Sequence, residues 1–365
     1  MQLHSLMLMD DTAILGSSKR ILVLRLKALE KYCDLYKMII NEGKTKFMVI
    51  NGSDEDKLPI HLNKLTVKHT QSYIYLGSPI SETGSMKNDL QRHANLNFKQ
   101  LNKFIIFCKN NDEMPYEFKK KVFDAVITSK LLYGCEAWLC EKFIKIDALH
   151  MSAVKALLGV RKQTRNDVTL VEGGINNVTK IVNERRNNFL KKKLVDEEEP
   201  LSIVYNLCKR ANTRGYQLLS KSNDVRAENT IEVTKERITA DENSSKLRTY
   251  KSINPHLSVH EVYHARKDKH IMDYKRVEFT RFRTSTHRLY IERGRWSRVP
   301  SEQRLCRCNR RNVEDEEHVT LNCEITNDLR ARYDIRGYTN LEMLFTKHNK
   351  YELVDFIFEV MKRFK

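Results

Sequence analysis

Short apolar runs and turn-forming residues alternate along the first eighty residues, a pattern typical of mixed α/β structure. Residues 6–9 and 13–15 are apolar and enclose Asp10 and Asp11, which predicts a tight β-hairpin with both carboxylates at its tip. From residue 17 to residue 40 apolar side chains recur every three or four positions, so we expect a helix that Ser17 or Ser18 caps.

Two further strands are expected before the pattern changes. Residues 44–50 and 72–76 are rich in β-branched and aromatic side chains, and the second run ends at a turn formed by residues 77–79. The predicted order in this part of the chain is therefore hairpin, helix, strand, turn and strand.

After residue 80 the apolar spacing becomes helical. Helices are expected over residues 86–109, from Pro115 to about residue 133, and from about residue 142 to residue 158. Gly159 is well suited to end the third helix, because glycine adopts the left-handed backbone at a helix C-terminus without a steric penalty. These segments predict a helical bundle.

The rest of the chain is more strongly charged. Gly173 and Gly174 end the bundle, and residues 182–209 again have a helical pattern, with runs of basic and acidic side chains. Residues 220–260 are polar and lack sustained periodicity, so we expect a linker or loose helices there. The predicted fold class is α+β, mostly α.

Composition places the chain among soluble globular proteins. A length of 365 residues predicts two or three domains, and the apolar content is 41% with a mean hydropathy of −0.56. No apolar run approaches the roughly 18–20 residues of a membrane-spanning helix, and the N-terminus lacks a secretory signal. We therefore expect a nuclear or cytoplasmic protein that is not secreted, in which the eight cysteines are too sparse for a disulfide framework.

The charge balance indicates a polyanionic partner. The chain carries 65 Lys and Arg against 47 Asp and Glu, a net charge of +18, and residues 266–311 alone hold fifteen basic and five acidic side chains. Aromatic side chains are interleaved with these charges at Tyr274, Phe279, Phe282, Tyr290 and Trp296. Because arginines hold phosphates and exposed aromatics stack on unpaired bases, this segment predicts contact with RNA or DNA. The alternative is a basic solvated face whose aromatics point into a core.

We assign the predicted contacts of this segment to its arginines and its tryptophan. They are Arg281, Arg283, Arg288, Arg293, Arg295 and Trp296.

The acidic pair in the first hairpin suits a divalent metal. Mg²⁺ takes oxygen ligands and usually rests on one or two carboxylates together with substrate phosphates. Asp10 and Asp11 are therefore candidate Mg²⁺ ligands. The alternative is an ordinary turn, in which adjacent aspartates are common.

A second metal site is predicted near the C-terminus. Cys306, Cys308, His318 and Cys323 supply four potential zinc ligands within eighteen residues. Four sulfur and nitrogen donors leave no position for a catalytic water, so a bound zinc would be structural. An acidic stretch, residues 314–317, is expected to start a helix that carries His318. The alternative is three reduced cysteines beside an ordinary histidine.

Three motifs in the first eighty residues together resemble a known family. The Asp10-Asp11 hairpin, the segment 40–46 and the turn Tyr75-Leu76-Gly77-Ser78 resemble, in the same order, the last three palm motifs of reverse transcriptases from non-LTR retrotransposons. Segments 129–138 and 157–160 resemble the thumb and connecting segments of these elements. The resemblance continues through Phe282-Arg283 and Gly294-Arg295-Trp296 to the cysteine/histidine cluster.

The resemblance implies a division of the chain and roles for its residues. Residues 1–80 would be a partial palm, 81–175 a helical thumb and connection, 176–260 a charged helical region with a linker, and 261–365 a basic region with a zinc-knuckle-like cluster. In the palm, Asp10 would ligate the catalytic metals, Asp11 would support them, and Lys44 would neutralise or protonate the pyrophosphate leaving group. Tyr75 and Gly77 would contact nucleic acid.

The resemblance also shows three departures. The family places a third catalytic aspartate on an earlier strand, which here would lie before Met1, and an aromatic residue where Leu8 stands. One residue, Arg307, separates the first two cysteines, where the family usually has two. We therefore expect a reverse-transcriptase fragment that is inactive as this chain. The alternatives are a nucleic-acid-binding module and an element remnant without a function of its own.

Overall fold

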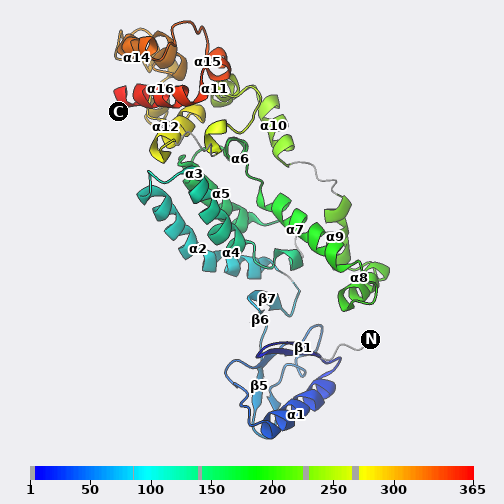
Figure 1. Cartoon of the computed structure of the whole chain (residues 1–365). Coiled ribbons are helices and arrows are strands. Elements are labelled where there is room, and N and C mark those ends of the chain that lie inside the picture. Colours follow the sequence, from blue (N-terminus) through cyan, green and yellow to red (C-terminus); the bar gives the residue numbers. More distant parts are fainter. Residues whose placement is uncertain (1–4, 85, 139–141, 225–229, 265–270) are drawn as a thin grey trace.

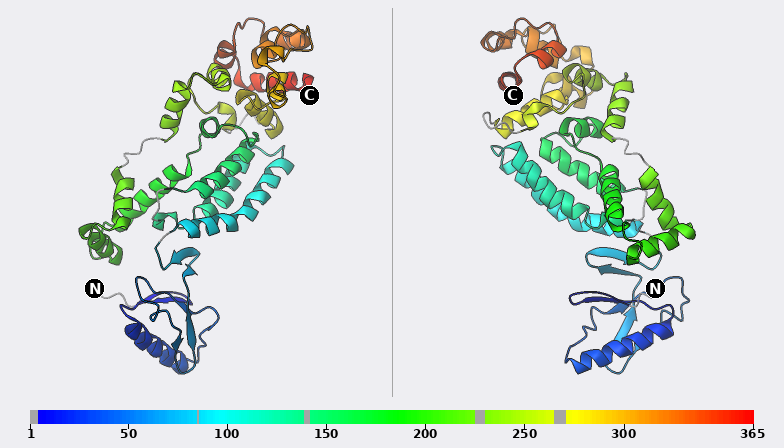
Figure 2. Two further views of the ribbon diagram at one scale, coloured as in Figure 1. Left: turned by 180° about the vertical axis from the view of Figure 1, so that it is seen from behind. Right: turned by 45° about the vertical axis from the view of Figure 1, so that its right-hand side comes forward.

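The computed structural model describes residues 5–84, 86–138, 142–224, 230–264 and 271–365. The molecule is elongated, with an N-terminal α/β unit at one end, helices in the middle and the C-terminal region at the other end (Figures 1 and 2). Most described residues are helical and the strands are few, so the predicted α+β, mostly α class is confirmed.

The strands are short. In chain order they are β1 (Ser5–Leu8), β2 (Asp11–Ile14), β3 (Lys46–Phe47), β4 (Ile60–His61), β5 (Thr66–His69), β6 (Ser72–Tyr75) and β7 (Ser78–Ser81). They form an antiparallel β1-β2 pair, a three-stranded sheet in the order β3-β5-β4, and an antiparallel β6-β7 pair. Only β3 and β5 are paired in parallel within the described part of the chain.

The α-helices account for most of the remaining structure. They are α1 (Lys19–Leu35), α2 (Lys87–Asn110), α3 (Tyr116–Val122), α4 (Ser129–Leu131), α5 (Ile144–Leu158), α6 (Asn166–Gly173), α7 (Val178–Lys193), α8 (Pro200–Arg210), α9 (Arg214–Asp224), α10 (Thr230–Ala240), α11 (Ser245–Ile253), α12 (Asp273–Arg283), α13 (Tyr290–Trp296), α14 (Asn327–Arg332), α15 (Leu341–Lys347) and α16 (Lys350–Arg363). Two π-helical segments, η1 (Phe123–Thr128) and η5 (His318–Asn322), and the 3-10 turns η2 (Cys135–Ala137), η3 (Glu261–Tyr263), η4 (Ser301–Gln303) and η6 (Glu324–Thr326) complete the set.

The predicted N-terminal hairpin is present, with its turn one residue earlier than expected. Leu8 pairs with Asp11, so the loop consists of Met9 and Asp10, and Met9 adopts a positive φ of 54°. Asp10 thus lies in the turn and Asp11 opens β2. All four residues of β1 are exposed, and within the described residues β1 pairs with β2 alone, so its outer edge is free.

A small core holds the rest of the N-terminal unit. The predicted helix is α1, whose cap is Ser18, which accepts a hydrogen bond from the N–H of Ile21. Leu26 of α1 packs with Phe47, Ile60, Leu65 and Val67 of the three-stranded sheet and its loops. The strand expected over residues 44–50 is reduced to β3, because only Lys46 and Phe47 pair with β5. Strands β4 and β5 were not predicted.

Two tight turns join this unit to the helices. Leu76 and Gly77 form the two-residue loop between β6 and β7 with φ values of 49° and 77°, as a type I′ turn requires. The Tyr133 hydroxyl donates to the Leu76 carbonyl at 2.9 Å, and a Cβ on Gly77 would lie 3.0 Å from the Tyr133 ring. At Gly134 a Cβ would lie 2.7 Å from Ser78 Oγ, so two glycines permit this close contact. The turn expected over residues 77–79 is wrong beyond Gly77, because Ser78 and the next three residues form β7.

The three predicted bundle helices are confirmed. Helix α2 packs along α5, and the second helix runs from α3 through η1 to α4. Pro115 is the N-cap of α3, and Gly159 ends α5 with a φ of 73°. Helix α6, which ends at Gly173 with Gly174 in the left-handed conformation, was not predicted.

Residues 220–260 contain more packed structure than their composition predicts. Helix α11 buries Leu247, Tyr250 and Ile253, and Ile238 of α10 is also fully buried. These helices use a narrow apolar stripe, because most of their other side chains are polar. Over the described part of this segment, the expectation of a linker or loose helices is wrong for α10 and α11.

A buried ionic network joins the C-terminal region to the bundle. Arg276 of α12 donates to the carbonyls of Leu157 and Leu158 at the end of α5, each at 3.1 Å, and to Asp273 at 2.6 Å. The other carboxylate oxygen of Asp273 accepts from Lys119 of α3 at 2.5 Å. All three charged side chains are at most 2% exposed.

A second buried pair lies about two turns farther along α12. Arg283 donates from two nitrogens to both carboxylate oxygens of Glu172 in α6, at 2.7 and 3.1 Å. The hydroxyls of Tyr250 and Tyr263 donate to the same carboxylate at 3.0 and 2.9 Å. Burial and the charge of Glu172 raise the pKa of both tyrosines well above 10, which keeps them protonated as donors.

The hydrophobic core also joins the bundle to the C-terminal region. One cluster contains Leu101, Phe104 and Leu157 of the bundle together with Phe279 of α12 and Phe356 of α16. Residues on both sides of position 175 therefore share a core, so the expected thumb and the expected basic region are one packed structure.

Removing the charge of Glu172 should destabilise the packing of α12 on α6. Glu172→Gln leaves Arg283 buried without its counter-charge, and breaking a buried pair in this way costs about 3–5 kcal/mol. Urea unfolding of the full chain would measure the loss. The matched control is Arg336→Gln, an exposed residue, which should change stability by less than about 0.5 kcal/mol. Equal effects of the two substitutions would contradict the structural role of the pair.

Candidate metal centre and basic surface

Four side chains near the C-terminus form a compact group of metal ligands. The ligand atoms of Cys306, Cys308, His318 and Cys323 all lie within 4.8 Å of one another. Cys306 Sγ is 3.7 Å from Cys323 Sγ, and Cys308 Sγ is 3.2 Å from His318 Nε2. A tetrahedral ion with metal–sulfur bonds of about 2.3 Å holds two sulfurs roughly 3.8 Å apart, so the Cys306–Cys323 pair already has the spacing that zinc requires.

The first two ligands lie on a tight loop. Leu305 and Val313 form a β-bridge, the N–H of Cys306 donates to the Asn312 carbonyl at 2.7 Å, and the N–H of Arg310 donates to the Cys306 carbonyl at 2.9 Å. This loop brings both thiols to one place although a single residue separates them. The short spacing between the first two cysteines therefore does not prevent convergence of the four ligands.

The other two ligands lie on and just after a π-helical turn. Asp315 accepts a hydrogen bond from the N–H of His318 at 2.8 Å, and the N–H of Cys323 donates to the carbonyl of His318 at 2.8 Å. The prediction that residues 314–317 start a helix carrying His318 is confirmed, with Cys323 directly behind it. The wider π turn sets the fifth residue after His318 back towards it.

Burial sets the protonation of the cluster in the absence of a metal. Burial raises the pKa of the Cys306 thiol to about 12 and also raises that of Cys323, while burial lowers the pKa of His318. At neutral pH the imidazole is therefore neutral and able to coordinate, and the thiols keep their protons unless a cation displaces them. The cluster can bind a metal such as zinc.

Two buried glutamates connect the cluster to α13. Glu314 and Glu316 stand between the two ligand pairs and are each 4% exposed. Glu314 accepts the N–H of Tyr290 at 2.7 Å, which caps the first turn of α13, and its carbonyl accepts the N–H of Ile291. Glu316 accepts from Ser285 at 2.7 Å and contacts His287 Nε2 at 2.8 Å. A metal bound by the cluster would hold residues 306–323 in place, and Glu314 and Glu316 of this segment in turn hold the start of α13.

Three predicted nucleic-acid contacts lie on the surface beside this segment. Arg288 and Arg293 are exposed, and Trp296 at the end of α13 is 65% exposed. Arg281 and Arg295 are half-buried. Arg281 donates to the Gly159 carbonyl at 2.7 Å, and Arg295 pairs with Glu292 at 2.9 Å.

Arg283 lies elsewhere. It is 2% exposed and bound to Glu172, so it is a core residue in this structure and is not part of the surface. Phe279 and Phe282 are fully buried, as the alternative interpretation of the aromatic side chains expected. Two aromatics of the basic segment therefore serve packing.

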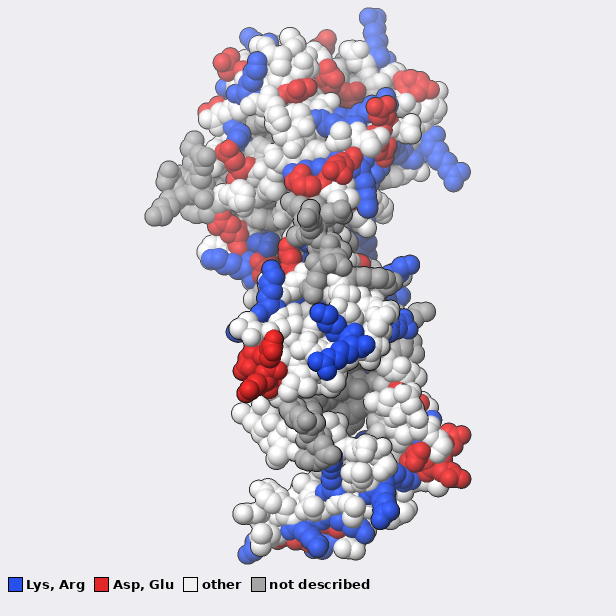
Figure 3. Space-filling model, turned by 90° about the vertical axis from the view of Figure 1, so that its right-hand side faces the viewer, with Lys and Arg blue, Asp and Glu red and all other residues white. Residues whose placement is uncertain are grey.

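Basic and acidic side chains are mixed over one face of the C-terminal part (Figure 3). On that face the net positive charge does not form one continuous basic surface. A binding site must therefore be argued from particular side chains and not from the charge excess.

The sequence analysis missed Arg161, which follows α5. Its guanidinium lies over the Trp296 ring, 4.4 Å from the ring centroid. The two residues are far apart in the chain, and neither the spacing nor the composition around Arg161 distinguishes it from other basic residues. Only the packing of α12 on the end of α5 brings it to Trp296.

The predicted palm residues lie at the other end of the molecule. Asp10, Asp11 and Lys44 are exposed, and the Lys44 carbonyl accepts from the Tyr73 hydroxyl at 3.1 Å. Tyr75 ends β6 and is half-buried, and Gly77 lies in the turn against Tyr133. Among the described residues, no third metal-binding side chain groups with the two aspartates. The Mg²⁺ assignment stays a prediction.

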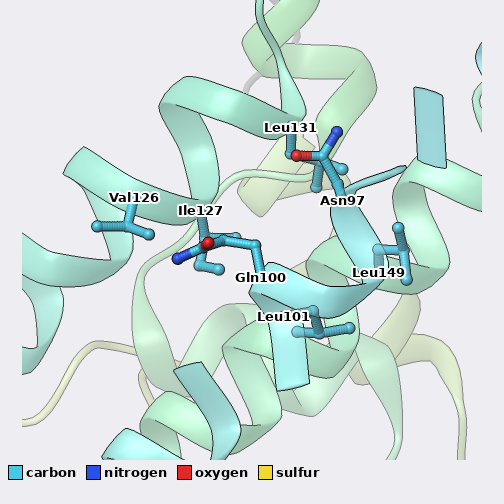
Figure 4. A pocket seen from close by; sticks show the side chains of 7 residues that line it. All are labelled: Asn97, Gln100, Leu101, Val126, Ile127, Leu131 and Leu149. Carbon is cyan, nitrogen blue, oxygen red and sulfur yellow. The ribbon is translucent and has the colours of Figure 1, made fainter. Parts of the chain in front are cut away.

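A shallow hollow in the bundle carries no such chemistry. Apolar side chains of α2, η1, α4 and α5 line it together with the amides of Asn97 and Gln100 (Figure 4). None of the lining residues is titratable, and none is a predicted site residue.

Comparison with known proteins shows a sequence similarity to a transposon-derived protein. The chain is 25% identical over 164 residues to an uncharacterized transposon-derived protein of Caenorhabditis elegans, a match that spans 43% of this chain and 57% of that protein. No protein-family profile matches the chain. No solved structure matches it either. Within the described residues, every helix is too short or too polar to cross a membrane.

Zinc should be retained by the purified chain and should order α13. We expect about one zinc ion per chain, because the four donors complete a tetrahedral site. Removing it with a chelator should increase hydrogen exchange over residues 285–323, including α13, and leave α1 unchanged. Affinity should rise between about pH 6 and pH 8, because the buried thiols, whose pKa values are raised, must lose protons to bind.

Substitution of a ligand tests the same site. Cys323→Ser should abolish zinc retention, whereas Cys208→Ser in α8, outside the cluster, should not. Metal content by atomic spectroscopy and exchange by mass spectrometry are the measurements. Retention of zinc by the Cys323 variant, or uniform exchange across the chain, would exclude the proposed centre.

Proposed function

We propose that the C-terminal part of this chain is a nucleic-acid-binding module that a metal ion organises, in a protein derived from the reverse transcriptase of a non-LTR retrotransposon. The observation that carries the proposal is the connection from the Cys306–Cys323 cluster through Glu314 and Glu316 to the start of α13. This connection fixes the helix whose arginines and tryptophan face solvent.

The cations on this surface suit phosphate. Arg288 and Arg293 are exposed. Arg293 lies 3.8 Å from the Glu314 carboxylate, whereas Arg288 forms no ion pair with a carboxylate within the described residues. Guanidinium groups bind phosphate oxygens bidentately, and each phosphate contact releases counterions. A surface of this kind supports binding of RNA or DNA without requiring sequence readout.

The origin rests on two independent observations. The order of the palm-like motifs in the first eighty residues resembles non-LTR reverse transcriptases, and the relative in C. elegans is described as transposon-derived. In the structure the palm-like turn at Gly77 contacts Tyr133, which lies in the thumb-like segment 129–138. This contact gives a physical reason for both motifs to occur together.

Polymerase activity is the second candidate, because Asp10 lies in a hairpin turn as the family requires. Asp10 and Asp11 are exposed, and among the described residues no third carboxylate groups with them. A two-metal site needs more ligands than these two side chains supply. We therefore expect no activity from this chain.

Binding should depend steeply on salt. The logarithm of the association constant for an oligonucleotide should fall linearly with the logarithm of the salt concentration. Arg288→Gln and Arg293→Gln should each reduce that slope by about 1, because each removes one phosphate contact. Lys31→Gln on the exposed face of α1 is the matched control and should leave the slope unchanged. Absent or salt-independent binding by the full chain would refute the module.

Primer extension addresses the second candidate. On an RNA template with Mg²⁺ or Mn²⁺ the full chain should give no product, because much of the transition-state charge stabilisation depends on the complete metal site. Asp10→Ala is the control for any product that does form. Robust extension that this substitution abolishes would show the inactivity prediction to be wrong.

A further inference from the structure

The tryptophan at the end of α13 is held by a cation on one face. Arg161 lies over its ring at 4.4 Å from the centroid, while 65% of the side chain is exposed. The indole therefore retains free surface next to a positive charge. Most large aromatic side chains in the surrounding region, such as Phe279 and Phe282, are fully buried, so this exposure is not a general property of the segment.

The position of the ring is fixed by packing beneath α13. A Cβ on Gly294 would lie 2.8 Å from the side chain of Arg304, so the glycine lets the helix lie directly on that arginine. Arg304 in turn donates to the carbonyls of Ile291 and Val299, on either side of Trp296, at 2.7 and 2.9 Å. Trp296 therefore stands at the end of a helix that packs closely on Arg304, and not on a loop without such contacts.

Two cations and two carboxylates lie near Arg161, and both carboxylates are engaged with other cations. Burial lowers the pKa of Arg161, and the nearby charges of Arg281 and Arg288 lower it further, while the carboxylates of Glu292 and Glu278 oppose this shift. Arg281 is paired with Glu278 at 3.1 Å, but within the described residues Arg161 and Arg288 form no ion pair. Glu292 pairs with Lys246 and Arg295. A phosphate would therefore meet two guanidiniums, those of Arg161 and Arg288, that have no ion-pair partner among the described residues.

We propose that Trp296, Arg161 and Arg288 form a site for an unpaired nucleotide, in which the base stacks on the indole and its phosphate lies against the two arginines. The inference rests on the proposed function and adds the class of substrate, single-stranded nucleic acid. In a duplex both faces of each internal base are covered by its neighbours, so a protruding indole gains no stacking partner there. In a single strand a base can turn onto the ring, and such stacking is sequence-tolerant.

The stacking geometry suits RNA and DNA alike. Both present a planar base next to a phosphate, and the three side chains include no group that would have to read the 2′-hydroxyl. The shared chemistry is therefore an unpaired base with its phosphate, and the two strand types are separate arms of the test.

The experiment measures binding of the full chain to labelled oligonucleotides by fluorescence anisotropy. The probes are oligo(U), oligo(dT), an abasic DNA strand and a DNA duplex, all of one length. Trp296→Ala should weaken binding to oligo(U) and oligo(dT) about 5- to 150-fold, the range that loss of one stacked base produces. The same substitution should change binding to the abasic strand and the duplex less than twofold.

Conservative variants separate stacking from folding. Trp296→Phe should keep part of the affinity, because a smaller ring still stacks, and Arg161→Lys should lose less than Arg161→Gln. Binding should also quench tryptophan fluorescence, and the quenching should vanish in Trp296→Phe, because the other tryptophan, Trp138, is only 1% exposed. A preference for oligo(U) or for oligo(dT) would identify the strand type, and equal affinity would assign the site to both.

The outcomes distinguish this inference from the proposed function. If the full chain binds no probe, the proposed function fails and the inference fails with it. If the chain binds with the expected salt dependence but Trp296→Ala leaves single-strand affinity unchanged, or weakens the duplex and the abasic strand equally, only the stacking site is overturned.

Discussion

The structure of the helical part depends on a few buried charges of α12. Arg276 satisfies the last carbonyls of α5 and pairs with Asp273, while Arg283 forms a two-nitrogen pair with Glu172 of α6. Buried charges are costly unless they are paired and hydrogen-bonded, and here tyrosine hydroxyls and backbone carbonyls complete the bonding. The network therefore fixes one docking of the C-terminal region on the bundle, and every surface feature near α13 depends on that docking.

The same residue type has two roles within one short segment. Arg276 and Arg283 lie in the core, whereas Arg288 and Arg293 face solvent, and the change occurs at the loop between α12 and α13. This loop is held by Glu316 through Ser285 and His287. The acidic residues that accompany the metal ligands thus determine which side of the basic segment is exposed, and they do so by accepting hydrogen bonds from it.

The two ends of the molecule differ in how closely their candidate metal ligands converge. At the C-terminal end four ligands converge, three of them buried and Cys308 half-buried, with hydrogen-bonded loops around them. At the N-terminal end the two aspartates stand on an exposed hairpin whose outer edge is free within the described residues. A metal site requires convergent donors, and only the first arrangement provides them here. The contact between the turns at Gly77 and Gly134 connects these two ends through the bundle.

The sequence alone determined the local features of this protein, because they depend on spacing within a few residues. Helix periodicity predicted α1, α2 and α5, the glycine at position 159 marked the end of α5, and the acidic pair marked the first hairpin. The four cysteine and histidine ligands were also identifiable, since their residue types and proximity in the chain define the chemistry. Short strands such as β4 and β5, and the packed helices α10 and α11, escaped prediction because tertiary contacts stabilise them more than local preference does.

Only the tertiary structure decided which charged and aromatic side chains are buried. Arg283 and Arg288 lie five residues apart in the basic segment. Nothing local distinguishes Arg283, which pairs with Glu172 more than a hundred residues away, from Arg288, which faces solvent. In the same way Arg161 reaches Trp296 only because α12 docks on the end of α5. Burial and long-range pairing are properties of the packed chain, and a linear pattern does not contain them.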